Sequence, residues 1–161
     1  MSWTARSAEL LVDGQGLLVP HQHIHSVEPI LDLERAVGPT RMIGELSVAD
    51  HRWPVYCIDR NLDVLGEIPP GRRACVLLRG PRGGFGILCD EVHVVDNEEL
   101  RMVPLPGCMQ GGSSLVDALA VVETKVVCVL SVQRLAAMLD PDEPLDDIAL
   151  GAGDDAAALE L

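Results

Sequence analysis

The chain has 161 residues, of which 48% are hydrophobic and only 2% aromatic, and its formal net charge is −13. Nucleic-acid-binding proteins use stacking aromatic side chains and a basic surface, so this composition argues against that class of partner. A chain of this length buries about 68–70% of its unfolded surface, which is enough for one domain or for two small fused lobes with an aliphatic core.

The first part of the chain reads as strands separated by turns. Strands at 9–12 and 17–19 flank Asp13-Gly14-Gln15-Gly16, a turn sequence typical of a β-hairpin. The other elements expected before residue 66 are a short helix or loop at 32–37, strands at 42–48 and 53–58, and one or two helical turns at 59–65.

Proline and glycine residues at 67–72 indicate a boundary between two lobes. The second lobe is expected to open with a hairpin, whose strands at 74–79 and 85–89 flank a glycine-rich turn. The elements expected after it are a strand at 93–95, a turn at 97–100 capped by Asn97, a Gly/Pro loop at 104–114, strands at 115–122 and 125–130, and a terminal helix at 132–139.

Acidic residues are concentrated after Leu139, where eight of the 25 acids and none of the 12 bases lie, so residues 1–139 carry 17 acids. We expect the segment 141–161 to be an acidic, flexible tail. An alternative is a brief helical docking face formed by Leu145, Ile148 and Leu150.

The five cysteines are an odd number, and four of them lie in strand-like apolar runs, where they act as small hydrophobic residues. These four are Cys57, Cys75, Cys89 and Cys128. The sequence shows no signal-peptide pattern at its start and no apolar stretch of about 18 residues. We therefore expect a cytoplasmic protein in a reducing compartment, without direct membrane insertion.

Two pairs of windows in the sequence resemble each other. The window 55–65 matches 129–139, because in both an apolar strand runs into a short segment with an arginine near its head and a leucine at its close. The window 24–27 matches 92–95 in the same order along the chain. This self-similarity predicts two copies of one β-module with a cleft between them, and the amphipathic strands favour two small barrels.

The span from about 11 to 139 resembles the CheW-like domain, the adaptor module of bacterial chemosensory arrays. The residues that carry the resemblance are Gly16 to Pro20 followed by Ile24, Pro39 and Gly44 ahead of a strand, Trp53-Pro54-Val55 leading into Ile58, Gly86 to Val92, and Val126 to Leu135.

The resemblance implies a mainly β fold of two five-stranded SH3-like barrels with a short C-terminal helix. On that reading, residues 8–140 form the CheW-like domain, with subdomains at about 8–66 and 72–140 and exchange of strands possible between them. The tail 141–161 would follow the domain.

The resemblance also implies a function without catalysis and without a cofactor. Stand-alone members of the family hold the tip of a methyl-accepting chemoreceptor and the regulatory domain of a CheA-type histidine kinase in one signalling complex. Those two proteins are therefore the expected partners. A structural protein that self-associates through its edge strands, or binds another partner, stays an alternative.

The sequence departs from the family at polar positions. Ala49 and Asp50 stand where an Arg-Gly pair is usual, and Ser26 stands where Glu is common. Cys57 and Ser131 stand where Asp is frequent, which implies the loss of two capping carboxylates. The chain is therefore expected to be a divergent adaptor, serving either flagellar chemotaxis or another array such as one that controls type IV pili.

The resemblance places partner contacts on a groove and on the edges of the barrels. The expected partner-binding residues are Ile24 and Ser26 on one wall, Gly44, Ala49 and Asp50 at the rim of the first barrel, and Asp90 and Val92 in the second.

Two other patterns have a chemical interpretation that we weigh lower. His21, His23 and His25 would lie on one face about 7 Å apart on an extended strand, with Glu28 nearby, which is conceivable for zinc or nickel. A tight turn after Pro20 would scatter the rings, so a polar surface turn is the preferred interpretation. Cys108 lies in a Gly/Pro loop without an adjacent base, which favours an ordinary exposed cysteine over a nucleophile.

Overall fold

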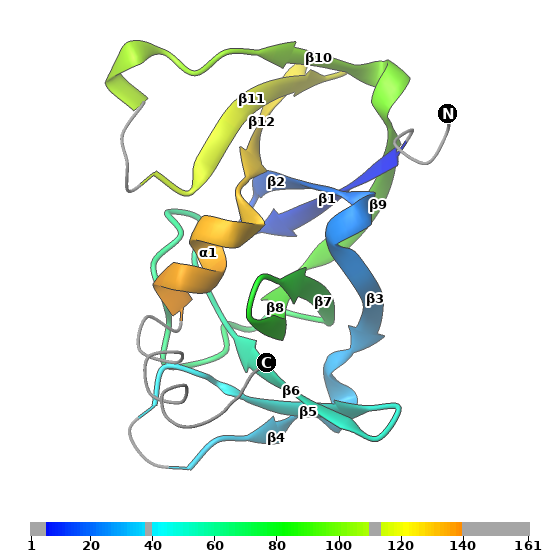
Figure 1. The fold of residues 1–161 in the computed structure, drawn as a ribbon, viewed down its shortest axis with the longest axis vertical. Coiled ribbons are helices and arrows are strands. Elements are labelled where there is room, and N and C mark those ends of the chain that lie inside the picture. Colours follow the sequence, from blue (N-terminus) through cyan, green and yellow to red (C-terminus); the bar gives the residue numbers. More distant parts are fainter. Residues whose placement is uncertain (1–5, 38–39, 110–113, 140–161) are drawn as a thin grey trace, which may run out of the picture.

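The computed structural model describes residues 6–37, 40–109 and 114–139, and the predicted tail at 141–161 lies outside this part of the chain. Two curled β-sheets are stacked one above the other, with one short helix at their junction (Figure 1). Among the described residues, no helix is long and apolar enough to span a bilayer.

The first sheet has six strands in the order β10-β11-β12-β2-β1-β9. Its strands are β1 (Arg6–Val12), β2 (Gln15–Pro20), β9 (Glu91–Asp96), β10 (Leu100–Val103), β11 (Val116–Val122) and β12 (Lys125–Leu130). The second sheet has six strands in the order β3-β7-β8-β6-β5-β4. Its strands are β3 (Ile24–Pro29), β4 (Glu34–Arg35), β5 (Gly44–Val48), β6 (His51–Tyr56), β7 (Ala74–Gly80) and β8 (Gly83–Cys89).

The two sheets exchange their hairpins. The hairpin β1–β2 pairs with strands from the second half of the chain, and the hairpin β7–β8 pairs with strands from the first half. The subdomain limits at 8–66 and 72–140 stay a prediction. The strand pairing shows that each sheet contains strands from both of these segments. The expected fold class is confirmed, with six strands rather than five in each sheet.

The repeat seen in the sequence corresponds to equivalent strand pairing in the two sheets. Each sheet contains one parallel pair, β12 with β2 and β6 with β8. Val129 is opposite Leu18 in the first, and Val55 is opposite Gly86 in the second. Val55 and Val129 are matched positions of the repeat, so the two copies use the same register.

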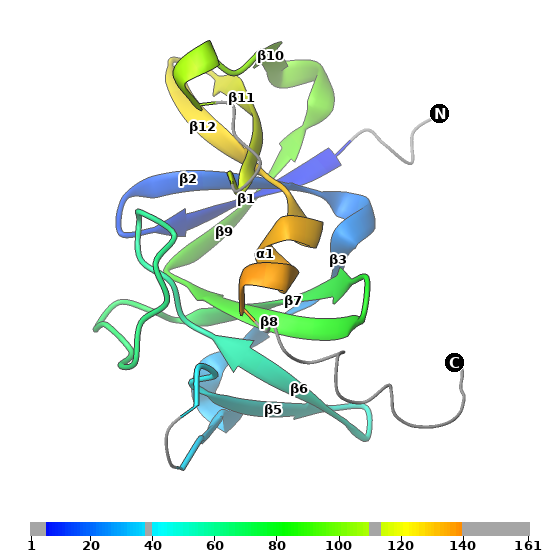
Figure 2. The ribbon, with the colours of Figure 1, turned by 60° about the vertical axis from the view of Figure 1, so that its left-hand side comes forward.

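The core is mainly aliphatic and is divided among three clusters of buried side chains in the described residues. The largest lies between the sheets and includes Leu10, Ile58 and Leu135, each 0% exposed. Burying such a side chain contributes about 1.5–3 kcal/mol. The helix α1 (Val132–Leu139), at the position expected for the terminal helix, packs its buried face on this cluster between the sheets (Figure 2).

Two local expectations were wrong. The segment 59–65 forms no helical turn, because the carboxylate of Asp59 binds its backbone and an isolated bridge joins Ile58 to Val64. Asn97 begins a 3₁₀ turn, Asn97–Glu99, but does not cap it, since its side-chain oxygen accepts a hydrogen bond from the hydroxyl of Ser7 at 2.8 Å.

Candidate functional site

An open groove of about 1060 Å³ lies between the loop that follows β6 and the helix α1. Five of its lining residues are apolar, and three of these, Leu62, Leu115 and Met138, also pack on the core between the sheets. The full lining is Asn61, Leu62, Asp63, Ser114, Leu115, Val116, Arg134, Ala137 and Met138. The groove is therefore an apolar extension of the central core that opens to solvent.

The first wall is the loop 59–65, which the Asp59 side chain holds in place. Asp59 Oδ1 accepts hydrogen bonds from the N–H groups of Asn61 at 2.9 Å and Asp63 at 3.0 Å. This Asx-type arrangement lets Leu62 adopt a φ of 68°, in the left-handed region. The turn thus presents the Leu62 side chain to the groove in a fixed conformation.

The second wall is α1, which the Ser131 hydroxyl caps. Ser131 Oγ accepts a hydrogen bond from the Arg134 N–H at 3.2 Å, as an N-cap residue does. The expected loss of a carboxylate at this position therefore does not leave the helix uncapped. The Arg134 guanidinium donates to the carbonyl of Ser114 at 2.6 Å and pairs with Asp117, so it ties α1 to the start of β11.

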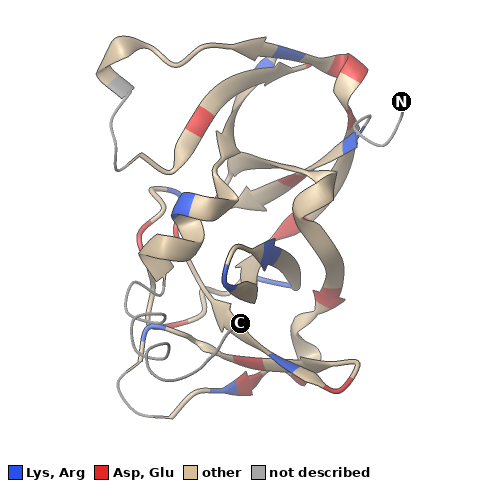
Figure 3. Cartoon of the chain, in the orientation of Figure 1, with Lys and Arg blue, Asp and Glu red and all other residues tan. Residues whose placement is uncertain are grey.

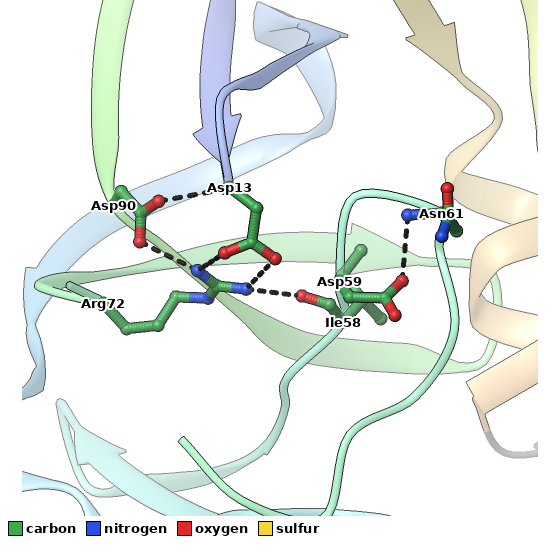
Figure 4. Close-up of polar contacts among 6 residues, drawn as sticks. All are labelled: Asp13, Ile58, Asp59, Asn61, Arg72 and Asp90. Atoms are coloured by element: carbon green, nitrogen blue, oxygen red, sulfur yellow. Dashed lines mark hydrogen bonds and ion pairs between the residues drawn. The ribbon is translucent and has the colours of Figure 1, made fainter. Parts of the chain in front are cut away.

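A buried arginine fixes the base of the first wall. The Arg72 side chain is 1% exposed, and its guanidinium donates to Asp13, Asp90 and the carbonyl of Ile58 (Figure 4). Arg72 Nη1 lies 2.8 Å from Asp13 Oδ1 and 2.9 Å from Asp90 Oδ1, and Nη2 lies 2.8 Å from the Ile58 oxygen.

These partners come from three places that the fold has to bring together. Asp13 is in the turn between β1 and β2, Asp90 is at the crossing from β8 to β9, and Ile58 begins the loop of the first wall. Asp90 Oδ2 also accepts a hydrogen bond from the Asp13 N–H at 3.0 Å. Arg72 therefore links both sheets to the groove.

The charges in this cluster stabilise one another. The hydrogen bond from Arg72 lowers the pKa of Asp13, against a smaller opposing effect of desolvation. Burial disfavours the charged form of Arg72, but the hydrogen bonds to Asp13 and Asp90 outweigh it and raise its pKa. Both groups are thus held in their charged forms.

The structure places the expected partner-binding residues away from this groove. Ile24 and Val92 are half-buried and pack on the core between the sheets, from β3 and β9 respectively. Ser26 is also half-buried on β3, and its hydroxyl is enclosed. Ile24 and Val92 thus pack on the same core from equivalent positions of the repeat.

The remaining expected residues divide into buried and exposed ones. Gly44 is buried, and a Cβ there would overlap the backbone of Glu34 on β4. Asp90 is half-buried in the Arg72 cluster. Ala49 and Asp50 are exposed at the turn between β5 and β6, with φ values of 52° and 67°. Of the seven expected residues, Ala49 and Asp50 are the two that are exposed, and the role of all seven in partner binding stays a prediction.

Sequence reasoning missed the residues that line the groove, although the sequence holds a signal for them. The two matched windows, 55–65 and 129–139, each begin in a strand and end in a groove wall. The apolar residues Leu62 and Met138 lie in the second half of those windows. The ends of the two repeats therefore face each other across the groove.

The histidine segment is folded as a 3₁₀ turn, His21–His23, followed by a β-bulge at His25. The bulge aims the His25 ring at Trp53, with ring centroids 4.8 Å apart. Within the described residues, no group of three His, Cys, Asp or Glu side chains is arranged to hold a metal ion.

The cysteines of the described segments are free thiols. Burial raises the pKa of Cys75 and of Cys89 to about 12 each, so both are protonated at neutral pH. Cys108 is exposed in the 3₁₀ turn Gly107–Met109.

Comparison with known proteins identifies the fold. No family model and no curated protein matches the sequence. Among solved structures, the chain is similar to the scaffolding protein TtCheW from Thermoanaerobacter tengcongensis, with a TM-score of 0.64 and 14% identity over 82% of this chain and 92% of that one. At this low identity the likeness shows the fold, which is that of CheW.

Proposed function

We propose that the protein is a non-catalytic adaptor that couples a chemoreceptor to a CheA-type histidine kinase in a bacterial chemosensory complex. The groove between loop 59–65 and α1 takes the helical tip of the receptor. A surface at the sheet edges takes the regulatory domain of the kinase. The complex forms in the cytoplasm.

The observation that carries this proposal is the apolar groove between the two repeat ends of a CheW fold. An amphipathic helix binds such a groove by laying its apolar face on it. The polar rim, with Asn61, Asp63 and Arg134, supplies the charges and amides that orient a helix without adding much affinity.

For the kinase, the exposed turn with Ala49 and Asp50 is the position that we favour among the seven expected from the sequence. Replacing Asp50 by Arg reverses one exposed charge, so it is expected to change the affinity for the kinase regulatory domain and the salt dependence of binding. Unchanged affinity at low and high salt would remove Asp50 from this site.

The receptor groove is tested with two arginine substitutions on the same helix. Ala137→Arg puts a charged side chain into the groove, whereas Gln133→Arg puts the same side chain on an exposed part of α1 outside it. Titration calorimetry with a receptor-tip fragment is expected to show at least about tenfold weaker binding for Ala137→Arg, equivalent to about 1.4 kcal/mol, and unchanged binding for Gln133→Arg.

Equal binding by both variants would show that the receptor does not use the groove. Absence of receptor and kinase binding by the wild-type protein, together with a stable homo-oligomer in light scattering, would replace the adaptor by the self-associating protein considered from the sequence.

A further inference from the structure

A second groove lies between α1 and the strands β6 and β8, with an empty volume of about 440 Å³. The rings of Tyr56 and Phe85 meet edge to face in it, with centroids 6.5 Å apart. Pro54 and Ala136 extend the apolar lining, and Leu139, the last residue of α1, completes it.

The one charged residue among those that line this groove is basic. Arg82, on the turn between β7 and β8, is exposed and lines it, and none of the lining residues is acidic. Arg41 lies at the same end of α1, where its guanidinium donates to the carbonyl of Met138 at 3.0 Å. The β7–β8 hairpin carries basic residues and no acidic one (Figure 3). An anionic segment with apolar side chains would fit this groove in charge and chemistry.

The chain itself carries such a segment directly after Leu139. Residues 140–161 contain eight acids and no base. Leu145 and Ile148 are three positions apart, the spacing that puts two side chains on one face of a helical turn. This segment lies outside the described part of the chain, and the last described residue is part of the groove lining.

We propose that the segment 140–161 docks back into this second groove of the same molecule. Leu145 and Ile148 pack on the apolar lining, and Asp146 and Asp147 lie near Arg82. Leu145 is six residues beyond Leu139, which allows a reach of about 20 Å at full extension, enough to turn back onto the groove.

The connection through α1 makes this docking feasible even for weak contacts. A short linker gives an effective concentration in the millimolar range, so a millimolar affinity already populates the docked form substantially. Because opposite charges contribute, salt is expected to release the segment. The receptor groove lies on another side of α1 and uses other residues, so this inference goes beyond the adaptor function and does not depend on it.

The test uses the full chain and the backbone amide signals of Gly83 and Gly84, which lie in the groove lining. The substitution pair Asp146→Lys with Asp147→Lys is expected to shift both glycine signals toward their positions in high salt. The control pair Asp154→Lys with Asp155→Lys makes the same change in net charge beyond the docking residues and is expected to leave them unchanged.

A complementary measurement follows hydrogen exchange in the segment itself. Arg82→Glu is expected to speed exchange at residues 145–148 at least about fivefold, and Arg101→Glu, an exposed position on β10, is expected to have no effect. Combining Arg82→Glu with Asp146→Lys and Asp147→Lys is expected to restore slow exchange.

Three results would overturn the proposal. The first is exchange at 145–148 as fast as in an unstructured peptide in the wild-type chain. The second is an equal glycine shift from both substitution pairs, which would indicate a general charge effect. The third is a dependence of the shifts on protein concentration, which would make a second copy of the chain the occupant.

Discussion

Replacing Arg72 by alanine is expected to destabilise the protein more than any exposed arginine does. The substitution removes a side chain that is 1% exposed and donates to Asp13, Asp90 and the carbonyl of Ile58. It leaves a cavity, an unpaired carbonyl and two neighbouring carboxylates without their shared cation. The loop that forms one wall of the groove beside α1 also loses the hydrogen bond that holds Ile58 at its start.

The size of the stability loss expected for Arg72→Ala depends on how exposed its two carboxylate partners are. Removing one member of a buried ion pair costs about 3–5 kcal/mol when the other stays buried. The side chains of Asp13 and Asp90 are 35% and 27% exposed, so water can solvate them after the substitution. We therefore expect a loss of about 3 kcal/mol, a large share of the 5–15 kcal/mol typical of a domain.

Urea unfolding followed by circular dichroism measures this loss. Arg73→Ala is the matched control, because Arg73 is the neighbouring residue and is exposed, and a change within about 0.5 kcal/mol is expected there. Arg72→Lys is expected to recover only a minor part of the stability, since an ammonium group does not reproduce the fork of a guanidinium. A loss below about 1 kcal/mol for Arg72→Ala would refute the assigned role.

Three further predictions concern stability and use the same unfolding assay. Ser131→Ala removes the cap of α1 and is expected to cost about 1 kcal/mol, whereas no loss would mean that the hydroxyl does not cap the helix in solution. Gly84→Ala is expected to cost about 1–3 kcal/mol of stability because a Cβ there overlaps the Trp53 ring. Gly66→Ala is the control and is expected to be neutral, because a Cβ at Gly66 meets no atom within 4 Å. Equal effects of the two substitutions would contradict the packing of Trp53. The pKa of Asp13 is lowered in the folded state, so its contribution to the free energy of unfolding is present above the ordinary value of 3.8 and is lost as pH falls through the lowered value. Asp13→Asn is therefore expected to flatten the acid side of the plot of stability against pH. An unchanged plot would contradict this.

The strands and the repeat were predictable because they depend on local patterns. Alternating apolar residues and glycine-containing turns marked the hairpins around Asp13 and Gly83, and both occur as expected. The helix at 132–139 was predictable because its apolar spacing fits one buried face. The matched windows indicated two modules, and their strands pair in equivalent registers.

The exchange of hairpins and the Arg72 cluster depend on contacts between distant residues, which local patterns do not contain. Arg72 and Asp13 are 59 positions apart, and nothing in either neighbourhood indicates their pairing. The segment 59–65 was misassigned because Asp59 competes for the backbone N–H groups that a helical turn would use. A groove was expected, but its lining residues were missed because the two walls are opposed only after the sheets have stacked.

The most direct test of the adaptor account is a titration of methyl-labelled methionine with a chemoreceptor-tip hairpin. Met138 lines the groove, whereas Met102 is 56% exposed on β10 and Met42 packs on the core outside the groove. The account predicts that the Met138 methyl signal shifts and saturates while those of Met102 and Met42 stay in place. A saturating shift at Met102 with an unmoved Met138 would contradict the groove as the receptor site.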